Sequence, residues 1–200
     1  AVADAIAEQG IVLVRDRDGA LDQLRSQSGK TLRVTLVDKD DGGGSAVGVT
    51  WPGKSVRLTD ASTPAEIAAA IQRVKKADEI IVSLFVKVRE LSGGIGLPPK
   101  LERVLKALRD EQHVAVVSFG SPYVVRNLPM ADVFVAAFTT TERVQRVASR
   151  LLAKRGFRGR LPVTIPGVAK AGFGLSDLVS PPRGIDDRPS KRSEVLEEAI

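Results

Sequence analysis

Three near-continuous apolar runs constrain the fold of this chain more than any other feature of its sequence. They span residues 80–86, 114–119 and 133–138. Each run is far too short to cross a bilayer, which takes about 20 apolar residues. Such runs are typical of strands buried on both faces, as in a parallel sheet covered by helices. Amphipathic helical patterns separate the runs, so we expect an α/β fold: a three-layer αβα sandwich around a mostly parallel sheet.

Shorter patterns extend this sheet and define the limits of the domain. Leu32, Val34 and Leu36 alternate with polar residues, as in a strand with one wetter face. Further strands are expected at residues 11–14, 56–59 and 161–165. Residues 1–179 are therefore expected to form one α/β domain. Residues 180–200, rich in proline and then in charge, are expected to be a linker or tail.

Two helix starts carry the sequence pattern of a capping box. Thr63 can cap a helix that Pro64 opens, and Glu66 stands where the second half of the box belongs. Thr139 and Glu142 repeat this spacing after the third apolar run. Helices are expected at residues 2–9, from 64 onwards, from 99 onwards and from about 140 to 154.

The amino-acid composition excludes several kinds of site. The chain has no cysteine, which excludes disulfides, thiolate zinc sites and cysteine nucleophiles. Its one histidine, His113, precedes a buried strand at the amino end, whereas ligands of such sheets sit beyond the carboxyl ends. We therefore interpret His113 as structural, and we expect no metal and no cofactor.

The formal net charge of +6 raises the question of an anionic partner. A platform for single-stranded nucleic acid needs exposed aromatic rings, and the chain has one Trp and one Tyr. Nucleic acid is therefore not favoured as a partner. Arg143, Arg146, Arg150 and Lys154 share one helical face. That face is expected to be either a solvated outer face or a docking face for another domain or an anionic polymer.

Residues 48–55 match the phosphate-binding loop pattern G-x-x-x-x-G-K-[ST]. Such a loop needs a strand before it and a helix after it, whose amino terminus faces the phosphates. Here residues 56–59 are predicted to be a strand, and bulky Trp51 and Pro52 stand where backbone amides should wrap the phosphate. We interpret the segment as a turn entering a short strand, with nucleotide binding as the alternative.

Polar loops follow the apolar runs at the edge of the sheet where ligands of parallel sheets bind. The candidate substrate-rim residues are Arg89, Glu90, Ser118, Ser121, Tyr123, Thr140 and Glu142. Ordinary caps and turns would use the same residue types, so that alternative stays open.

These loops belong to a longer series of short motifs. In chain order the motifs are SLFVKVR at 83–89, GIGLPP at 94–99, SFGSPY at 118–123, TE and QR within 138–152, GRLPVTIPG at 159–167 and FGL at 173–175. The series resembles the carboxy-terminal α/β domain of glycoside hydrolase family 3, nearest the β-N-acetylhexosaminidase (β-N-acetylglucosaminidase) branch. The resemblance extends from about residue 5 to 178. Two features depart from the family pattern: residues 38–54 are short and glycine-rich where a helix is usual, and Ser121 replaces an expected Asn.

The resemblance implies an accessory domain of a glycosidase. In this family a (β/α)₈ barrel precedes the α/β domain, and in the hexosaminidase branch it supplies an aspartate nucleophile and an Asp-His acid/base pair for retaining hydrolysis. Nothing in this chain matches the barrel. The barrel and its glycan substrate are therefore the implied partners, and we expect the chain alone to be inactive. Because it begins with Ala1 and not with Met, we expect it to be a processed or excised part of something longer.

Glu90 is the one candidate catalytic residue. Related β-glucosidases of the family place their acid/base glutamate on the loop that follows the corresponding strand, where this chain has Glu90. The neighbouring Arg89 would keep Glu90 ionised, which suits a base or an ion pair better than an acid.

Two other functions remain as alternatives: a stand-alone non-catalytic module that binds a glycan or a partner, and a nucleotide or nucleic-acid binder. Glycan modules usually present flat aromatic rings, for which this chain offers Trp51 and Tyr123. The absence of cysteine and the habit of the family favour an extracytoplasmic location.

Overall fold

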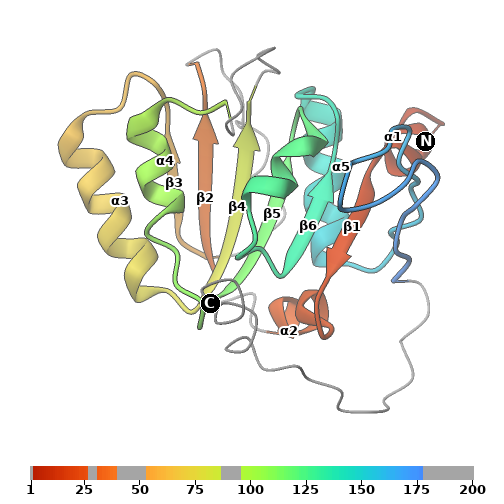
Figure 1. Cartoon of the computed structure of the whole chain (residues 1–200), viewed down its shortest axis with the longest axis horizontal. Helices are drawn as coiled ribbons and strands as arrows, with labels where there is room; N and C mark the ends of the chain where they lie inside the picture. Colours follow the sequence, from red (N-terminus) through yellow and green to blue (C-terminus); the bar gives the residue numbers. More distant parts are fainter. Residues whose placement is uncertain (1, 27–30, 40–52, 87–95, 178–200) are drawn as a thin grey trace, which may run out of the picture.

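The computed structural model describes residues 2–26, 31–39, 53–86 and 96–177. This part of the chain forms a six-stranded sheet in the order β1-β6-β5-β4-β2-β3 (Figure 1). The strands are β1 (Val12–Asp16), β2 (Leu32–Val37), β3 (Ser55–Leu58), β4 (Glu79–Phe85), β5 (His113–Ser118) and β6 (Val133–Ala136). Neighbouring strands are parallel, except that β1 pairs antiparallel with β6. The predicted mostly parallel sheet, with the three apolar runs side by side, is confirmed.

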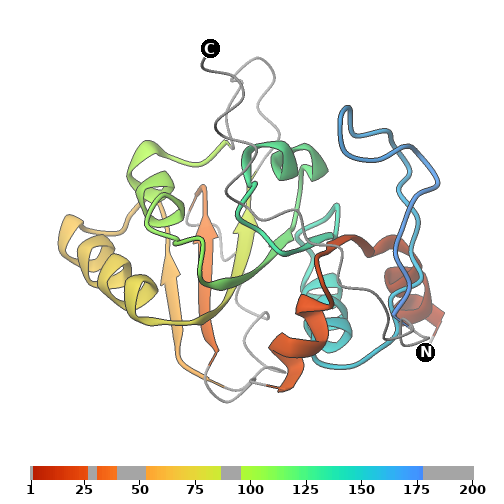
Figure 2. The ribbon, with the colours of Figure 1, turned by 60° about the horizontal axis from the view of Figure 1, so that its bottom comes forward.

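Helices cover both faces of this sheet. They are α1 (Val2–Gly10), α2 (Ala20–Ser26), α3 (Pro64–Lys76), α4 (Pro99–Leu105), the 3₁₀ helix η2 (Pro122–Asn127) and α5 (Glu142–Ala153). Apolar residues of α3, α4 and η2 pack on one face, and those of α1, α2 and α5 pack on the other. Figure 2 separates the two layers, with α3 and α4 on one side of the sheet and α2 and α5 on the other. The predicted αβα sandwich is confirmed.

Side-chain alternation within each strand produces the two cores. On β4, Ile80, Val82 and Leu84 belong to the core under α3 and α4. Ile81 and Phe85 point to the opposite face and belong to the core under α2 and α5. Both faces of the strand are apolar, which is why its sequence is an almost unbroken apolar run.

The capping box at the start of α3 forms as predicted. The Thr63 hydroxyl accepts a hydrogen bond from the Glu66 N–H at 3.3 Å, and the Glu66 carboxylate accepts one from the Thr63 N–H at 2.7 Å. The Glu66 carboxylate also accepts from the Thr63 hydroxyl at 3.0 Å, and the hydrogen bonds from the Thr63 N–H and hydroxyl hold the pKa of Glu66 below its usual value.

The second predicted capping box is wrong. The cap of α5 is Thr141, which makes no side-chain capping hydrogen bond. Thr139 lies in a tight turn instead: its N–H donates to the Ala137 carbonyl at 2.8 Å. Phe138, the central residue of that turn, has a φ of 58°. A turn of this kind is strained for a residue other than glycine, and it delays the start of the helix until residue 142.

The predicted strand at residues 161–165 is also wrong. The segment makes only a single bridge, between Ile165 and Ala169. Pro162 has no N–H with which to extend a ladder. Leu161 and Ile165 are nevertheless buried and pack into the core under α3 and α4. The apolar signal of the segment therefore reflects burial of an irregular chain and not membership of the sheet.

The basic face of α5 contacts α1 of the same chain. Arg143 forms an ion pair with Asp4 at 3.0 Å, and Arg150 pairs with Glu8. Glu8 also accepts from Arg158 at 2.7 Å, and the hydrogen bonds from Arg158 and Arg150 hold the pKa of Glu8 below its usual value. Two of the four cations of this face, Arg143 and Arg150, therefore contact this chain's own first helix, and docking of another domain or an anionic polymer stays a prediction.

None of the helices in the described residues has the length and apolarity that a membrane crossing requires.

Candidate functional site

The carboxyl ends of β2, β4, β5 and β6 lie at one edge of the sheet, the upper edge in Figure 1. This is the edge at which ligands of open α/β sheets bind. Of the loops predicted to form the site, 119–123, after β5, and 139–142, after β6, are described in full. Arg89 and Glu90, which follow β4 in the sequence, lie outside the described residues.

Gly120 brings the loop after β5 into contact with the end of β4. A Cβ atom on Gly120 would lie 2.3 Å from the Val86 carbonyl oxygen, so no side chain fits there. The adjacent Phe119 N–H donates to the Leu84 carbonyl at 2.8 Å. The start of the loop 119–123 therefore lies directly against the end of β4.

Ser118 and Ser121 shape this loop from within. Ser118 is fully buried, and its hydroxyl donates to the Ser121 carbonyl at 2.7 Å. The Ser121 hydroxyl accepts from the Tyr123 N–H at 3.3 Å and so caps η2. Both hydroxyls are thus committed to the loop itself, whereas the Tyr123 residue is 42% exposed.

The loop after β6 presents Thr140 and Glu142 to solvent. The Thr140 carbonyl accepts from the amide nitrogen of buried Gln145 at 2.7 Å, which fixes the loop to α5. Glu142 pairs with Arg146 at 3.3 Å on the exposed first turns of that helix. Of the seven predicted rim residues, Tyr123, Thr140 and Glu142 are therefore exposed among the described ones.

The strained turn at Phe138 lies at the same edge. Residues with unfavourable backbone angles cluster where a structure must hold a loop in one position, including active sites and ligand clamps. Here the turn sets the direction in which residues 139–142 leave β6. This feature has no signature in the sequence, because phenylalanine rarely adopts a positive φ.

Asp38 is a site candidate that sequence reasoning did not find. It directly follows β2 at the same edge, and the residue is only 4% exposed. Its N–H donates to the Phe85 carbonyl at 3.0 Å, which ties it to the end of β4. The sequence could have indicated it, because Asp38 comes immediately after a predicted strand and shortly before a glycine-rich stretch.

The described edge offers hydrogen-bonding groups that suit a polar, uncharged ligand. Hydroxyls such as those of Tyr123 and Thr140 both donate and accept, and an ionised carboxylate such as that of Glu142 accepts only. Within the described ranges, no group of three or more His, Asp or Glu side chains could hold a metal ion. The arrangement can orient a ligand, and it supplies no described nucleophile with its own base.

The opposite edge of the sheet holds His113 and the described part of the phosphate-loop pattern. His113 begins β5, at the amino end of the strand, and stands beside Glu79 of β4 in the sheet register. Burial raises the pKa of Glu79, and the nearby His113 partly offsets this. Ser55 begins strand β3, which confirms that a strand and not a helix follows the pattern.

Several solved structures with a similar fold are glycosidases. The fold matches a fungal multi-domain glycoside hydrolase family 3 β-N-acetylglucosaminidase with a TM-score of 0.63 and 17% identity, over 85% of this chain. It matches a family 3 β-N-acetylglucosaminidase from Paenibacillus sp. strain FPU-7 with a TM-score of 0.58 and 17% identity, over 76% of this chain. It matches a β-glucosidase from Listeria innocua with a TM-score of 0.56 and 16% identity, over 76% of this chain.

The matched region is only a part of each of these proteins. It covers 19% of the fungal chain, 30% of the Paenibacillus chain and 24% of the Listeria chain. No family model matches the sequence, and no curated protein gives a significant match. At 16–17% identity these matches show a similar fold and no more. The predicted resemblance to family 3 is therefore confirmed for the fold.

Proposed function

We propose that this chain is the accessory α/β domain of a family 3-type retaining β-N-acetylhexosaminidase. In this proposal it packs on a (β/α)₈ catalytic barrel, and the barrel supplies the nucleophile. Residues 1–179 form the domain, and the carboxyl edge of its sheet shapes the rim of the barrel's active site. The observation that carries the proposal is the unequal coverage: the fold accounts for 85% of this chain and 19% of the fungal enzyme.

The rim would act by positioning the sugar and by excluding water from the active site. A retaining glycosidase holds two catalytic groups on either side of the glycosidic bond, about 5–5.5 Å apart in the usual carboxylate case. The sugar must be held in one orientation between them, since small displacements of the reacting atoms slow the reaction strongly. Tyr123, Thr140 and Glu142 are exposed at the edge and can form hydrogen bonds to sugar hydroxyls, while the Tyr123 ring can cover an apolar sugar face.

The loops that carry these residues are held rigidly, which favours such a role. Ser118 and Ser121 fix one loop through their hydroxyls, and Gln145 fixes the other from within α5. Binding groups are most effective when packing and hydrogen bonds behind them lock their positions. The accessory role is tested by comparing hydrolysis by the chain alone with hydrolysis by the chain joined to a barrel.

The proposal also predicts how replacing Glu90 changes the rate of hydrolysis. Because the hexosaminidase branch is proposed to carry its acid/base group in the barrel, Glu90→Gln in the barrel-containing enzyme should lower the rate by less than about threefold. A true general acid would lose about 10²–10⁴-fold. The measurement is kcat/KM on a substrate with a poor leaving group, which depends most on proton donation.

A matched control for this variant is Glu111→Gln. Glu111 is exposed just before β5, at the opposite edge of the sheet, so its substitution removes the same charge far from the rim. A hundredfold loss with Glu90→Gln and no loss with Glu111→Gln would assign the acid/base role to this domain. That result would contradict a hexosaminidase-type mechanism.

A further inference from the structure

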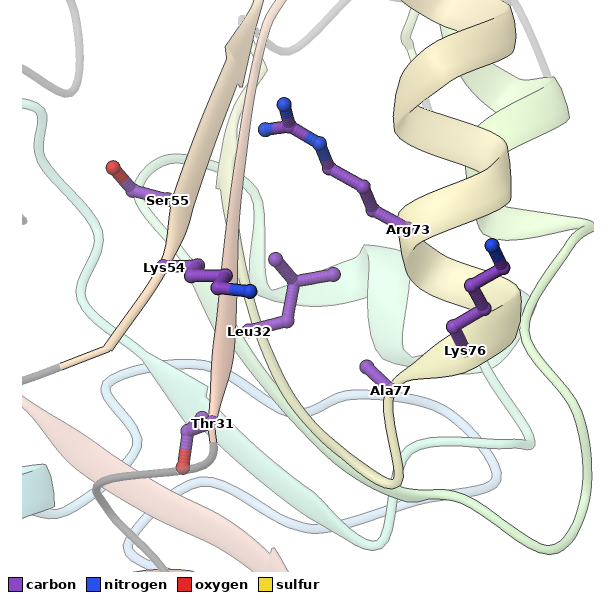
Figure 3. Close-up of a pocket in the computed structure, with 7 residues that line it drawn as sticks. All are labelled: Thr31, Leu32, Lys54, Ser55, Arg73, Lys76 and Ala77. Atoms are coloured by element: carbon purple, nitrogen blue, oxygen red, sulfur yellow. The ribbon is translucent and has the colours of Figure 1, made fainter.

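A surface depression of about 770 Å³ lies at the amino edge of the sheet, away from the proposed rim. The starts of β2 and β3 form one wall, and the last turn of α3 forms the other (Figure 3). Three of its lining residues are cations: Lys54, Arg73 and Lys76. Figure 3 shows the Arg73 side chain extending from α3 toward the strands, with Lys54 reaching from the start of β3.

These three cations have no counter-ion among the described residues. Their side chains make no ion pair and no hydrogen bond there, and the described residues that line the depression include no carboxylate. Some other basic side chains of the described residues are paired, as Arg25 is with Asp177 and Arg158 is with Glu8. Unpaired like charges around one cavity repel one another, and a bound anion would relieve that repulsion.

The carboxyl end of α3 explains only part of this arrangement. Cations are favoured in the last turn of a helix, which accounts for Arg73 and Lys76. It does not account for Lys54, which comes to the same cavity from another element. The end of α3 also has its own polar cap, since the Gln112 side-chain amide donates to the Val74 carbonyl at 2.7 Å and to the Ala77 carbonyl at 2.6 Å.

We propose that this depression binds a small ligand that carries two or more phosphate groups. The Arg73 guanidinium can take one phosphate through two parallel hydrogen bonds, and Lys54 and Lys76 act as point charges for the rest. Leu32 and Ala77 give an apolar wall for an organic part of the ligand. The volume lies within the range of small-molecule pockets.

Lys54 and Ser55 are the last two residues of the phosphate-loop pattern found in the sequence. In this site Lys54 contributes its side chain at the start of a strand, whereas the Ser55 side chain points away from the depression, and no helix amino terminus takes part. The inference therefore goes beyond the proposed accessory function and does not depend on a barrel.

The test uses the full 200-residue chain and inorganic pyrophosphate as the probe. Binding is followed by NMR amide shifts or calorimetry at low and at physiological ionic strength. We expect saturable binding of one pyrophosphate per chain that weakens with added salt. Arg73→Gln should raise the dissociation constant by about fivefold or more, since it removes a charge-assisted contact at an exposed site.

Lys75→Gln is the matched control, because Lys75 belongs to the same last turn of α3 and does not line the depression. It should change the dissociation constant by less than about twofold. Both side chains are exposed, so the melting temperature of each variant should stay close to that of the parent chain.

Three results would overturn the proposal. The first is the absence of saturable binding at low ionic strength. The second is an equal weakening by Lys75→Gln and Arg73→Gln, which would indicate only general attraction to a basic surface. The third is binding of a short DNA duplex that exceeds binding of pyrophosphate and is insensitive to Arg73→Gln.

Discussion

Replacing Arg25 with alanine is expected to lower the free energy of unfolding by about 3–5 kcal/mol, because it breaks a buried ion pair and leaves the Asp177 carboxylate without its cation. Arg25 and Asp177 lie 2.6 Å apart, and their side chains are 12% and 9% exposed. Arg25 also donates to the carbonyls of Leu151, Leu152 and Lys154, each at 2.8 Å. These carbonyls belong to the end of α5, where a helix has no internal donors left.

Asp177 extends this network to the chain that follows α5. Its carboxylate accepts from the N–H groups of Gly156 and Phe157, at 2.8 and 2.7 Å. A single arginine thus joins α2, the end of α5 and the last described residue of the domain.

Urea-induced unfolding measures this effect, with Arg155→Ala as the control. Arg155 pairs with Asp22 at 2.7 Å, but both side chains are more than 40% exposed. An exposed pair of this kind contributes about 0–1 kcal/mol. If Arg25→Ala and Arg155→Ala cost the same, the network does not hold these elements together.

Replacing Gly120 with alanine is the second substitution with a large expected effect. The new Cβ atom would lie 2.3 Å from the Val86 carbonyl oxygen, and backbone atoms cannot rotate away as a side chain can. Forcing extra atoms into a packed contact costs about 1–3 kcal/mol. We also expect the loop 119–123 to move away from the end of β4, which would disturb the proposed rim.

Gly10→Ala is the matched control for this substitution. Gly10 is the last residue of α1, and a Cβ atom there meets nothing within 4 Å. Its unfolding free energy should change by less than about 0.5 kcal/mol. Equal free energies of unfolding for the two variants would mean that the close approach of residues 86 and 120 does not restrict the residue at position 120.

The sheet could be predicted because burial on both faces leaves a direct mark on the sequence. Strands β4, β5 and β6 appear as apolar runs, and the capping box of α3 appears as Thr63-Pro64-Ala65-Glu66. The direction of β1 could not be predicted, since an apolar run is the same for parallel and antiparallel pairing. A different ambiguity produced the error at residues 161–165, because an apolar pattern does not distinguish a strand from an irregular segment that is buried without ladder hydrogen bonds.

Short helices were missed for a different reason. The helix α2 (Ala20–Ser26) is seven residues long and follows a charged stretch that has the composition of a turn. Its start is held by the Asp16 carboxylate, which accepts from the Leu21 N–H at 3.0 Å. Two turns of helix carry too little periodicity to be distinguished from a loop, and packing against the sheet stabilises them.

The location of the candidate site could be predicted, but the orientation of its side chains could not. Parallel strands place their carboxyl ends at one edge, so the loops after β5 and β6 had to meet there. Whether a serine faces solvent or its own loop depends on backbone geometry within that loop, as the buried hydroxyl of Ser118 demonstrates. Arg25 and Asp177 are 152 positions apart, beyond the reach of any local pattern.

The proposed accessory role is tested most directly by comparing the hydrolysis of an aryl N-acetylglucosaminide by residues 1–200 alone with its hydrolysis by the same chain joined to a family 3 barrel. The account predicts turnover by the barrel-containing protein and none above background by the chain alone. Turnover that co-purifies with the isolated chain and disappears in its Glu90→Gln variant would contradict it.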